Sequence, residues 1–396
     1  FLEAIREFKN DVNKNDVAYI HVTLLPYIKT SGEIKTKPTQ HSVKELRSIG
    51  IQPDILVCRC DREISKSDIR KISVFCNVDE DSVIQAIDVD TIYAVPKDLK
   101  INGLDVAVLN ALGKSTFPKS NLRKWNKVVD RIRKPSGEVT IGVVGKYLEL
   151  NDAYKSLFEA LTHGGVSNNV KVKIKNIDTD KLEKNKNKTL FNGVNGLLVP
   201  GGFGKRGSEG KIFASKYARE NKIPFFGICF GMQMAVVDVS RNLLEYKSAS
   251  SSEFGKTDTP VIGLLTEWLK DEEIQKRDFE SEYGGTMRLG SYPAILKKGS
   301  KVRNIYGSKK INERHRHRYE VNMSFVDDLE RVGLKFVGMS PDGLLPEIVE
   351  LKNHPWFIGV QFHPELKSRP FNPHPLFSSF IKASVKKSKI SGKVKK

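Results

Sequence analysis

One cysteine constrains the fold of this chain more than any other residue. Cys229 stands in the sequence Gly-Ile-Cys-Phe-Gly, between an apolar run at 223–228 and a run at 232–239 with the pattern of a helix. A nucleophile between a strand and a helix, with Gly227 and Gly231 on either side, is typical of a nucleophile elbow, whose tight turn excludes side chains. The alternative is a buried structural cysteine, the commoner role of a free thiol. The elbow predicts an α/β fold with the thiol at a strand end.

A histidine and a carboxylate far downstream supply the partners that a catalytic thiol needs. The apolar run at 356–362 predicts a buried strand, and His363 and Glu365 follow it. His363 can take the proton of Cys229 and return it to a leaving amine, while Glu365 holds the imidazole in the required tautomer. A lone histidine in a loop is more often a surface residue. In a chain with a cysteine elbow, we interpret this pair as the rest of a Cys-His-Glu triad.

A glycine-rich turn upstream of the elbow predicts an oxyanion hole. The apolar strand at 196–199 runs into Pro200, Gly201 and Gly202. Acyl transfer needs backbone N–H groups aimed at the developing oxyanion, and Gly202 can supply one while Phe230, next to the thiol, supplies the other. An ordinary glycine turn is the alternative interpretation. A phosphate-binding loop is excluded, because neither G-x-x-x-x-G-K-[ST] nor G-x-G-x-x-G fits this segment.

Composition limits the class of protein. A chain of 396 residues, 39% of them hydrophobic, is long enough for two domains with substantial cores. The sequence contains no apolar run long enough to span a membrane and no signal peptide. Its four cysteines form no disulfide framework and match no zinc pattern, so we expect a reducing, cytoplasmic location and no metal site. The chain opens with Phe1 in what resembles mid-helix sequence, so we expect it to begin inside a larger protein.

The net charge of +19 raises the question of nucleic-acid binding, but its distribution argues against it. Lysines gather in the segment 181–188 and in a C-terminal tail at 385–396, which has no acidic residue and which we expect to be disordered. Neither run interleaves aromatic side chains for base stacking. Weak polyanion binding is compatible with this pattern, whereas a dedicated nucleic-acid site is not predicted.

The pattern changes near residue 135 and divides the chain into two domains. Residues 1–130 mix strands and helices, 131–138 form a linker around Lys-Pro-Ser-Gly, and 139–384 form the second domain. In the first domain we expect strands at 17–25, 54–57 and 91–95 and a helix at 41–48.

The second domain alternates strands with helices. We expect strands at 139–144, 170–174, 196–199 and 223–228, and helices from 151 or 152 to 163, ended by Gly164 and Gly165, and at 210–219 and 232–239. Regular βα alternation predicts a mainly parallel, doubly wound sheet with the site at the carboxyl ends of its strands. The fold class is therefore α/β, with two domains.

The three motifs together resemble the class I glutamine amidotransferases, whose pattern is P-G-G…G-x-C-x-G-x-Q…H-P-E, over about 139–384. Further segments are similar to the CTP synthase family, namely 145–147, 152–156, 284–290 and 313–322, with 31–42 in the first domain. This resemblance implies a flavodoxin-like glutaminase domain after the later part of a P-loop-type synthetase domain, each with a mainly parallel, doubly wound sheet.

The resemblance implies roles for the matched residues of the second domain. Cys229, His363 and Glu365 would be the catalytic triad, and Gly202 and Phe230 the oxyanion donors. The glutamine contacts would be Gly202, Phe230, Gly231, Met232, Gln233, Glu253 and Arg318. Arg318 can pair with the α-carboxylate of glutamine and Glu253 can accept from its α-ammonium group, although weak surface ion pairs are the alternative role of both.

The resemblance also implies nucleotide contacts in the first domain. UTP, and CTP as a feedback inhibitor, would contact Lys35, Thr36, Lys37, Pro38, Thr39, Gln40 and Lys71, and ATP would contact Asp88 and Val89. The lysines, hydroxyls and amide of the segment 35–40 suit phosphate oxygens, although a solvated polar loop would have the same composition.

The family makes CTP from UTP, ATP and ammonia released from glutamine, so the resemblance implies a C–N ligase of pyrimidine biosynthesis. It also implies Mg²⁺ with ATP, GTP as an allosteric activator, and a homotetramer. The phosphate-binding loop and the Mg²⁺ ligands would precede residue 1. Three alternatives remain: an amidotransferase for another acceptor, a non-catalytic polyanion-binding protein, and a filament-forming protein with a decayed site, against which the intact triad counts.

Overall fold

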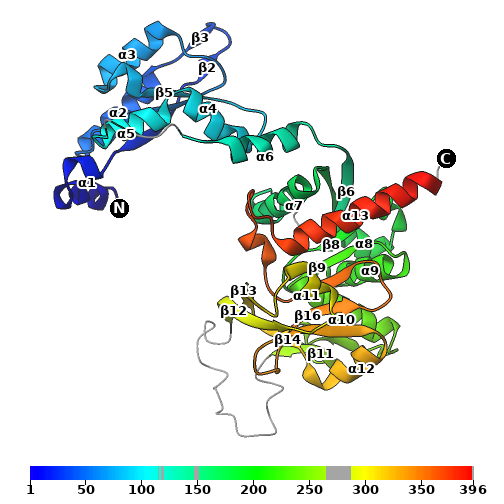
Figure 1. The fold of residues 1–396 in the computed structure, drawn as a ribbon. Coiled ribbons are helices and arrows are strands. Elements are labelled where there is room, and N and C mark those ends of the chain that lie inside the picture. The colour runs from blue at the N-terminus through cyan, green and yellow to red at the C-terminus, as the bar shows by residue number, and fades with distance from the viewer. Residues whose placement is uncertain (115, 117–119, 147–150, 265–286, 395–396) are drawn as a thin grey trace. The chain divides into compact units, whose positions relative to one another are not determined.

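The chain forms two compact units, each with its own sheet and core (Figure 1). The computed structural model describes residues 1–114, 116, 120–146, 151–264 and 287–394, and the units are Phe1–Asp130 and Arg131–Lys396. Two segments that carry the family resemblance extend beyond these residues, since Tyr147 and Gly284–Thr286 lie outside the described part.

A three-stranded parallel sheet forms the centre of the first unit. Its order is β1 (Ile20–Leu24), β4 (Ile55–Cys60) and β5 (Val83–Ile87). The central position of β4 explains why Arg59 alone among its residues is exposed. The unit also contains β2 (Tyr27–Ile28), β3 (Glu33–Ile34), α1 (Leu2–Asp11), α2 (Lys37–Ser48), α3 (Lys66–Cys76), α4 (Val95–Ile101), α5 (Leu104–Ala111) and α6 (Arg123–Arg133) up to Asp130.

Helices cover both faces of this sheet. On one face Val43 of α2 and Ile72 of α3 pack in a cluster with Leu56. On the other face Ala107 of α5 packs in a cluster with Ile55. Because successive residues of a strand point to opposite faces, the neighbours Ile55 and Leu56 belong to separate cores. The predicted doubly wound, parallel arrangement is confirmed in this unit.

The strand expected at 91–95 is wrong. Ile92–Ala94 form a single 3-10 turn, and α4 follows it directly with Pro96 in its first turn. Proline ends strands, but its fixed φ and missing N–H also suit the first turn of a helix, which leaves its N–H groups unpaired. For the same reason α2 begins earlier than expected, at Lys37, with Pro38 in its first turn.

A nine-stranded mixed sheet forms the centre of the second unit. In the part of the chain that the structure describes, five strands run parallel in the order β17–β9–β8–β6–β7, and β16, β15, β12 and β13 extend the sheet as antiparallel strands beyond β17. The strands are β6 (Glu138–Gly145), β7 (Lys171–Asp178), β8 (Gly196–Val199), β9 (Phe225–Ile228), β12 (Arg288–Leu296), β13 (Lys310–His317), β15 (Leu334–Met339), β16 (Pro346–Leu351) and β17 (Phe357–Val360). A smaller sheet contains β10 (Ala249–Ser251), β11 (Thr259–Leu264) and β14 (Tyr319–Val321). The parallel part has the predicted alternation, whereas the antiparallel part was not foreseen.

Helices pack on both faces of the large sheet as well (Figure 1). Phe225 of β9 belongs to the core that α9 and α10 cover, and its neighbour Phe226 contacts Phe377 and Phe380 of α13 in the opposite core. The helices of this unit are α7 (Lys155–Asn168), α8 (Thr179–Asn185), α9 (Ser208–Glu220), α10 (Phe230–Asn242), α11 (Lys301–Tyr306), α12 (Val326–Arg331) and α13 (Pro375–Val394).

Helix α7 continues past the two glycines that were expected to end it. It runs through Gly164 and Gly165 and ends where Asn169 takes a left-handed φ of 54°. A Cβ on Gly164 would lie 3.0 Å from the carbonyl oxygen of Phe377, and one on Gly165 would lie 2.7 Å from a backbone oxygen of Val170. The glycines therefore permit close packing of α7 rather than terminating it.

The C-terminal tail is helical where disorder was expected. Helix α13 runs for 20 residues to Val394, so the expectation of a disordered segment at 385–396 is wrong for its described part. The helix is anchored by Phe377, Phe380 and Ile381, which are fully buried. Lysine has a good helix propensity, and cations are stabilised near the C-terminal end of a helix. The lysines therefore continue the helix instead of breaking it.

Candidate active site

The carboxyl end of β9 places Cys229 at a strained turn before α10. Cys229 has φ 52° and ψ −108°, a conformation that residues with side chains rarely adopt. A Cβ on Gly231 would overlap the carbonyl oxygen of Val199, and one on Gly227 would lie 2.7 Å from a backbone oxygen of α10. Met232, a predicted glutamine contact, is buried one position further along α10. The turn therefore has the geometry of a nucleophile elbow.

His363 comes from the strand beside the elbow. Strand β17 pairs in parallel with β9, and the N–H of Cys229 donates to the carbonyl oxygen of Val360 at 2.7 Å. Three residues later, Nδ1 of His363 lies 2.7 Å from Oε1 of Glu365, and these two side chains are 16% and 13% exposed. Because the carboxylate is an acceptor, Nδ1 carries a hydrogen and Nε2 is left for the thiol.

The thiol and the imidazole are electrostatically coupled. Burial by itself lowers the pKa of His363, but its hydrogen bonds with Cys229 and Glu365 outweigh burial and raise this pKa to about 10. Cys229 is 5% exposed, and Nε2 of Gln361 approaches its sulfur at 3.7 Å. A protonated imidazole beside the sulfur stabilises the thiolate, the form in which cysteine is a nucleophile.

The glycine turn after β8 lies against this pair. A Cβ on Gly201 would lie 2.8 Å from Cε1 of His363 and 3.7 Å from Cβ of Cys229. A Cβ on Gly202 would lie 3.9 Å from Cδ1 of Phe230. Phe230 is the first residue of α10, where backbone N–H groups precede the helical hydrogen-bond pattern. The structure thus brings the two predicted oxyanion donors together beside the thiol.

Gln233 connects the elbow helix to the segment that carries Arg318. Its Nε2 donates to the carbonyl oxygen of Tyr319 at 2.8 Å and to Oε1 of Gln361 at 3.2 Å. Arg318 lies between β13 and β14, directly before Tyr319. The predicted glutamine contacts Gln233 and Arg318 are therefore close in the structure, because Gln233 binds the residue that follows Arg318.

Glu253 and Lys211 flank the glycine turn with opposite charges. Oε1 of Glu253 accepts the N–H of Gly204 at 2.6 Å, and burial raises the pKa of Glu253. Nζ of Lys211 would lie 2.9 Å from a Cβ on Gly202 and is 4.7 Å from the centre of the Phe230 ring. Burial lowers the pKa of Lys211 to about 7, with a further contribution from the charge of Lys146. The turn is thus held between an acid and a base.

Sequence reasoning missed two residues of this site, Lys211 and Gln361. Gln361 stands two residues before His363 in the apolar run at 356–362 for which the sequence predicts a strand, and the period of two of a strand predicts that both side chains point to one face. That signal was sufficient to find Gln361. Lys211 lies in a helix of mixed polarity, and no local pattern distinguishes it from a solvent-facing lysine.

The predicted UTP contacts surround the start of α2 in the first unit. Lys37 and Pro38 are exposed in its first turn, and Lys35, just before it, pairs with Glu33 at 2.7 Å. Lys71, on α3, is exposed, and its charge adds to the effect of Lys35 in lowering the pKa of Glu33. Three lysines therefore give this surface a positive potential.

The two threonines of the same segment turn inward. Thr39 is completely buried, and its hydroxyl donates to Oγ1 of Thr23 at 3.1 Å. Nε2 of Gln40 donates to Oγ1 of the buried Thr36 at 3.1 Å. In this structure the lysines and the proline face solvent, while the hydroxyls hold α2 against the sheet.

The predicted ATP contacts follow β5. Asp88 comes directly after the last residue of the strand and pairs with Nη2 of Arg59 at 2.6 Å, with both side chains more than half exposed. Val89, the next residue, is partly buried. The carboxyl ends of parallel strands are where α/β sheets bind ligands, so this position suits a nucleotide contact.

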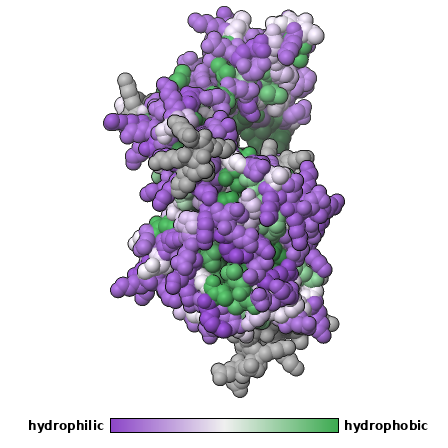
Figure 2. All heavy atoms as spheres, turned by 90° about the vertical axis from the view of Figure 1, so that its right-hand side faces the viewer, coloured by the Kyte–Doolittle hydropathy of each residue, from purple (hydrophilic) through white to green (hydrophobic). Residues whose placement is uncertain are grey.

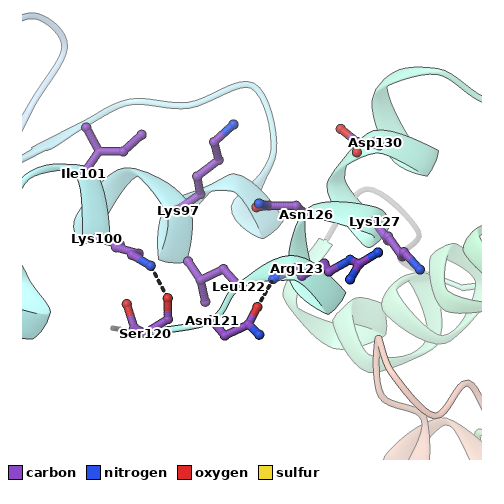
Figure 3. Close-up of a pocket in the computed structure, with 10 residues that line it drawn as sticks. All are labelled: Lys97, Lys100, Ile101, Ser120, Asn121, Leu122, Arg123, Asn126, Lys127 and Asp130. Carbon is purple, nitrogen blue, oxygen red and sulfur yellow. Dashed lines mark hydrogen bonds between the residues drawn. The ribbon is translucent and has the colours of Figure 1, made fainter. Parts of the chain in front are cut away.

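Residues of α4 and α6 line a hollow of about 780 Å³ in the first unit (Figure 3). The lining contains Lys97, Lys100, Arg123 and Lys127 against the single carboxylate of Asp130, so its potential is positive. The ammonium of Lys100 donates to the carbonyl oxygen of Ser120, and the N–H of Arg123 donates to Oδ1 of Asn121 at 3.0 Å. Sequence reasoning did not predict this hollow, although cations three and four residues apart share a helix face.

The described residues contain neither a cluster of metal ligands nor a membrane-spanning helix. No group of three or more His, Cys, Asp or Glu side chains there is placed to hold a metal ion. Within the same residues, no helix combines the length and the apolar character needed to cross a membrane.

Both parts of the chain match families of known proteins. The family model for class-I glutamine amidotransferases matches residues 149–383, and the model for the CTP synthase N-terminus matches residues 1–113. The chain is 59% identical over 391 residues to a CTP synthase from Bradyrhizobium diazoefficiens and 60% identical over 390 residues to one from Brucella abortus. Each alignment covers 98% of this chain and 72% of the relative.

A solved structure has a similar fold. The glutaminase domain of Trypanosoma brucei CTPS, determined with bound acivicin, is 35% identical to this chain, with a TM-score of 0.56. The similarity covers 63% of this chain and 94% of that domain.

Proposed function

Because the chain belongs to the CTP synthase family of glutamine-hydrolysing ligases in pyrimidine biosynthesis, we propose that Cys229, His363 and Glu365 are its catalytic triad. Ammonia released at this triad converts UTP to CTP in a reaction driven by ATP. One observation carries the proposal: the imidazole that bonds to Cys229 also donates from Nδ1 to Oε1 of Glu365 at 2.7 Å.

Glutamine hydrolysis begins when Cys229 gives its proton to Nε2 of His363 and its sulfur attacks the side-chain amide carbon. The carbonyl oxygen becomes an oxyanion, which the N–H groups of Gly202 and Phe230 stabilise. His363 then protonates the leaving nitrogen, ammonia departs, and a thioester remains on the sulfur. A water molecule that His363 deprotonates hydrolyses the thioester to glutamate. Glu365 holds the imidazole throughout and keeps its negative charge.

Glutamine is recognised at both ends in this proposal. Arg318 pairs with the α-carboxylate and Glu253 accepts from the α-ammonium group. The position of Arg318 beside Tyr319, whose carbonyl oxygen binds Gln233, supports the first contact. The hydrogen bond from Gly204 to Glu253 supports the second, because it keeps a carboxylate at the edge of the oxyanion turn. Gly202, Phe230, Gly231, Met232 and Gln233 are the remaining proposed contacts of glutamine.

The first domain binds the nucleotides. UTP is phosphorylated by ATP at its 4-position, and ammonia displaces the phosphate to give CTP, ADP and inorganic phosphate. We assign UTP and the inhibitor CTP to Lys35, Thr36, Lys37, Pro38, Thr39, Gln40 and Lys71, and ATP to Asp88 and Val89. The solvent-facing lysines at the start of α2 support this assignment. Residues 1–130 then act as the synthetase part, 131–138 as the linker and 139–384 as the amidotransferase.

Four further parts of the proposal follow from the family alone. GTP activates glutamine hydrolysis, CTP inhibits the synthetase reaction, Mg²⁺ accompanies ATP, and the active form is a homotetramer. Mg²⁺ would neutralise the phosphate charge of ATP.

The test compares two nitrogen sources in the full-length enzyme. We expect Cys229→Ala to abolish CTP formation from glutamine and to leave CTP formation from ammonium chloride close to that of the wild type. The reason is that the thiol acts only on glutamine, while ammonia enters the second reaction directly. Equal loss of both activities, with the variant folded, would contradict a separate glutaminase site.

A further inference from the structure

Five ionisable side chains form a buried cluster next to Arg318, and none of them takes part in the chemistry above. This Arg288 cluster consists of Arg288 on β12, His315 and His317 on β13, Glu320 on β14 and Glu347 on β16. The five side chains are between 0% and 11% exposed. Placing this many polar groups away from water is unfavourable unless they compensate one another, so their arrangement needs an explanation.

Arg288 joins two carboxyl groups. Its Nη1 donates to Oε1 of Glu320 and its Nη2 to Oε1 of Glu347, both at 2.8 Å. Burial raises the pKa of Glu320 to about 8 and also raises the pKa of Glu347, in each case against the attraction of the guanidinium. One cation faces two carboxyl groups, so ionisation of both would leave a net negative charge in the interior. The cluster is balanced when it holds one proton.

The two imidazoles form a neutral pair. Nδ1 of His315 lies 2.9 Å from Nε2 of His317, so one ring donates and the other accepts. Burial lowers the pKa of His315 to about 3 and lowers the pKa of His317 well below its usual value, and the charges of Arg288 and His363 act in the same direction. The balancing proton is therefore held by a carboxyl group and not by an imidazole.

Four atoms of the cluster have no hydrogen-bond partner within the described part of the chain: Oε2 of Glu320, Oε2 of Glu347, Nε2 of His315 and Nδ1 of His317. Nε2 of His315 lies 3.5 Å from Oε2 of Glu347, and Nδ1 of His317 lies 3.5 Å from Oε1 of Glu320. Each imidazole thus has an open nitrogen facing a carboxyl group. Since the two neutral rings share one hydrogen bond, one open nitrogen carries a hydrogen and faces an ionised carboxyl group, while the other open nitrogen can accept from the carboxyl group that holds the proton.

Residues of the cluster lie on both sides of Arg318, the proposed contact for the α-carboxylate of glutamine, in the sequence. Arg318 is the single residue between β13 and β14, and the cluster includes His317, directly before it, and Glu320, two residues after it. Strand β13 pairs with β12 in the large sheet, whereas β14 pairs with β11 in the small one. The chain therefore changes sheets at Arg318, between two anchored positions.

The same strand also holds the triad histidine. The backbone N–H of His363 donates to the carbonyl oxygen of Arg314, on β13, at 2.7 Å. The positive charge of His363 reaches both imidazoles of the cluster, since it contributes to their lowered pKa values. A shift of β13 would thus move Arg318 and His363 together.

We propose that the Arg288 cluster, carrying one proton, positions Arg318 for the α-carboxylate of glutamine, and that loss of this proton weakens glutamine binding. The inference rests on the proposed function, in which Arg318 contacts glutamine. Ionisation of the second carboxyl group places an uncompensated charge between β12, β14 and β16, which draws Arg288 away from its balanced position and shifts the strand junction. The cluster residues are positioning residues, because none of them contacts the substrate.

Other ionisable groups face the cluster from neighbouring elements. Tyr292 of β12 lies under Arg288, with the guanidinium 4.7 Å from its ring centre, and edge-on to His315 at 5.4 Å. Asp342, after β15, contributes to the raised pKa of Glu347 and so favours retention of the proton. His363, as a cation, disfavours a proton on the imidazoles. These groups keep the proton on the carboxyl side of the cluster.

The first test uses Glu320→Gln in the full-length enzyme, because an amide copies a protonated carboxyl group that cannot ionise. We expect the wild-type KM for glutamine to rise several-fold between about pH 7 and pH 9, and the KM of the variant to change much less. Ionisation of glutamine itself affects both enzymes alike. Glu350→Gln is the control, since Glu350 is a partly buried carboxylate on the same strand as Glu347 that binds the backbone N–H groups of Lys301 and Val302. The control should follow the wild type.

The second test uses His317→Gln, which removes the imidazole pair next to Arg318. We expect the KM for glutamine near pH 7 to rise about tenfold, the size expected when a charge-assisted contact of the substrate is misplaced. The rate with ammonium chloride should not change. A substrate without an α-carboxylate should be hydrolysed as in the wild type, which a general structural defect would not allow.

The proposal is overturned if Glu320→Gln shows the same change of KM with pH as the wild type, or if its KM is already raised near pH 7. It is also overturned if His317→Gln, shown to be folded by its thermal unfolding, binds glutamine normally. Failure of the proposed function has a different signature, because Cys229→Ala would then still make CTP from glutamine, whatever the cluster variants do.

Discussion

Nδ1 of His363 lies 2.7 Å from Oε1 of Glu365, although the two residues are separated by a single proline. Pro364 starts a short 3-10 helix, Pro364–Lys367, which turns the chain so that the carboxylate folds back on the imidazole. Both members of the pair therefore come from one tight turn at the end of β17. The thiol comes from the neighbouring strand, so the proposed triad depends on the pairing of β17 with β9.

Replacing Gly201 with alanine tests the contact between the oxyanion turn and His363. A Cβ at this position would lie 2.8 Å from Cε1 of His363, which is closer than real Cβ contacts allow, so the ring must move. Displacement of a catalytic group by about 1 Å reduces rates by about 100-fold. We expect a loss of about this size in kcat for glutamine, with little change in the rate with ammonium chloride.

The control for this variant is Gly137→Ala, where the new Cβ would lie 4.0 Å from Cγ1 of Val170, an ordinary van der Waals distance. It should leave both rates unchanged. Normal glutamine hydrolysis by Gly201→Ala would mean that the imidazole adjusts freely and that its observed position is not needed.

Replacing Arg318 with alanine tests the anchor for glutamine. Loss of a charge-assisted pair with the α-carboxylate should weaken binding by about 1.5–3 kcal/mol, which is roughly 10- to 150-fold in KM. A substrate that lacks the α-carboxylate should be hydrolysed at the wild-type rate. Arg316→Ala is the matched control, because Arg316 is exposed two residues earlier on β13. If Arg318→Ala affected both substrates equally, Arg318 would have a structural role.

The elbow and the residues of the proposed triad could be picked out from the sequence because their signals are local. Gly227 and Gly231 bracket the thiol within five residues, and His363 and Glu365 stand two residues apart. The proline-led helix α4 was missed because Pro96 is compatible with a strand end as well as a helix start. The C-terminal helix was missed because the run of like charges was interpreted as a sign of disorder, whereas lysine has a favourable helix propensity.

The Arg288 cluster could not be predicted from local patterns. Arg288 and Glu347 are 59 positions apart, and they meet only because β12, β15 and β16 are antiparallel neighbours. The expected alternation of strands with helices contained no antiparallel segment, so their register was unknown. Lys211 was missed for a similar reason, since its burial depends on the glycine turn from β8.

Replacing Lys37 with alanine tests the nucleotide assignment. Lys37 is exposed in the first turn of α2, so its ammonium is available for a phosphate group. We expect the KM for UTP to rise about tenfold, as for the loss of one charge-assisted contact, with the KM for glutamine unchanged. Lys44→Ala on the same helix is the control, since Lys44 is exposed and lies outside the motif. An unchanged KM for UTP in Lys37→Ala would remove this residue from the UTP site.

We expect His354 to make the stability of the second unit depend on pH. Its Nε2 lies 3.2 Å from the carbonyl oxygen of Ala218, and its Nδ1 accepts the N–H of Trp356 at 3.2 Å, so both nitrogens are satisfied in the neutral ring. Burial lowers the pKa of His354 from 6.5 to about 4. Protonation of Nδ1 would break the hydrogen bond from Trp356.

The direction of this pH dependence follows from proton uptake by the unfolded chain. Between about pH 6.5 and pH 4 the unfolded chain binds a proton at His354 that the folded chain does not bind, so the folded state loses stability as the pH falls through this window. The expected slope is about 1.4 kcal/mol per pH unit for this one group. We expect His354→Gln to be less stable near pH 7, where the ring contacts are lost, and to lose less stability than the wild type on acidification. Denaturant unfolding followed by tryptophan fluorescence at several pH values measures both slopes.

His41→Gln, which removes an exposed ring on α2, is the control and should keep the wild-type slope. Parallel slopes for His354→Gln and the wild type would mean that His354 is not held neutral in the folded protein.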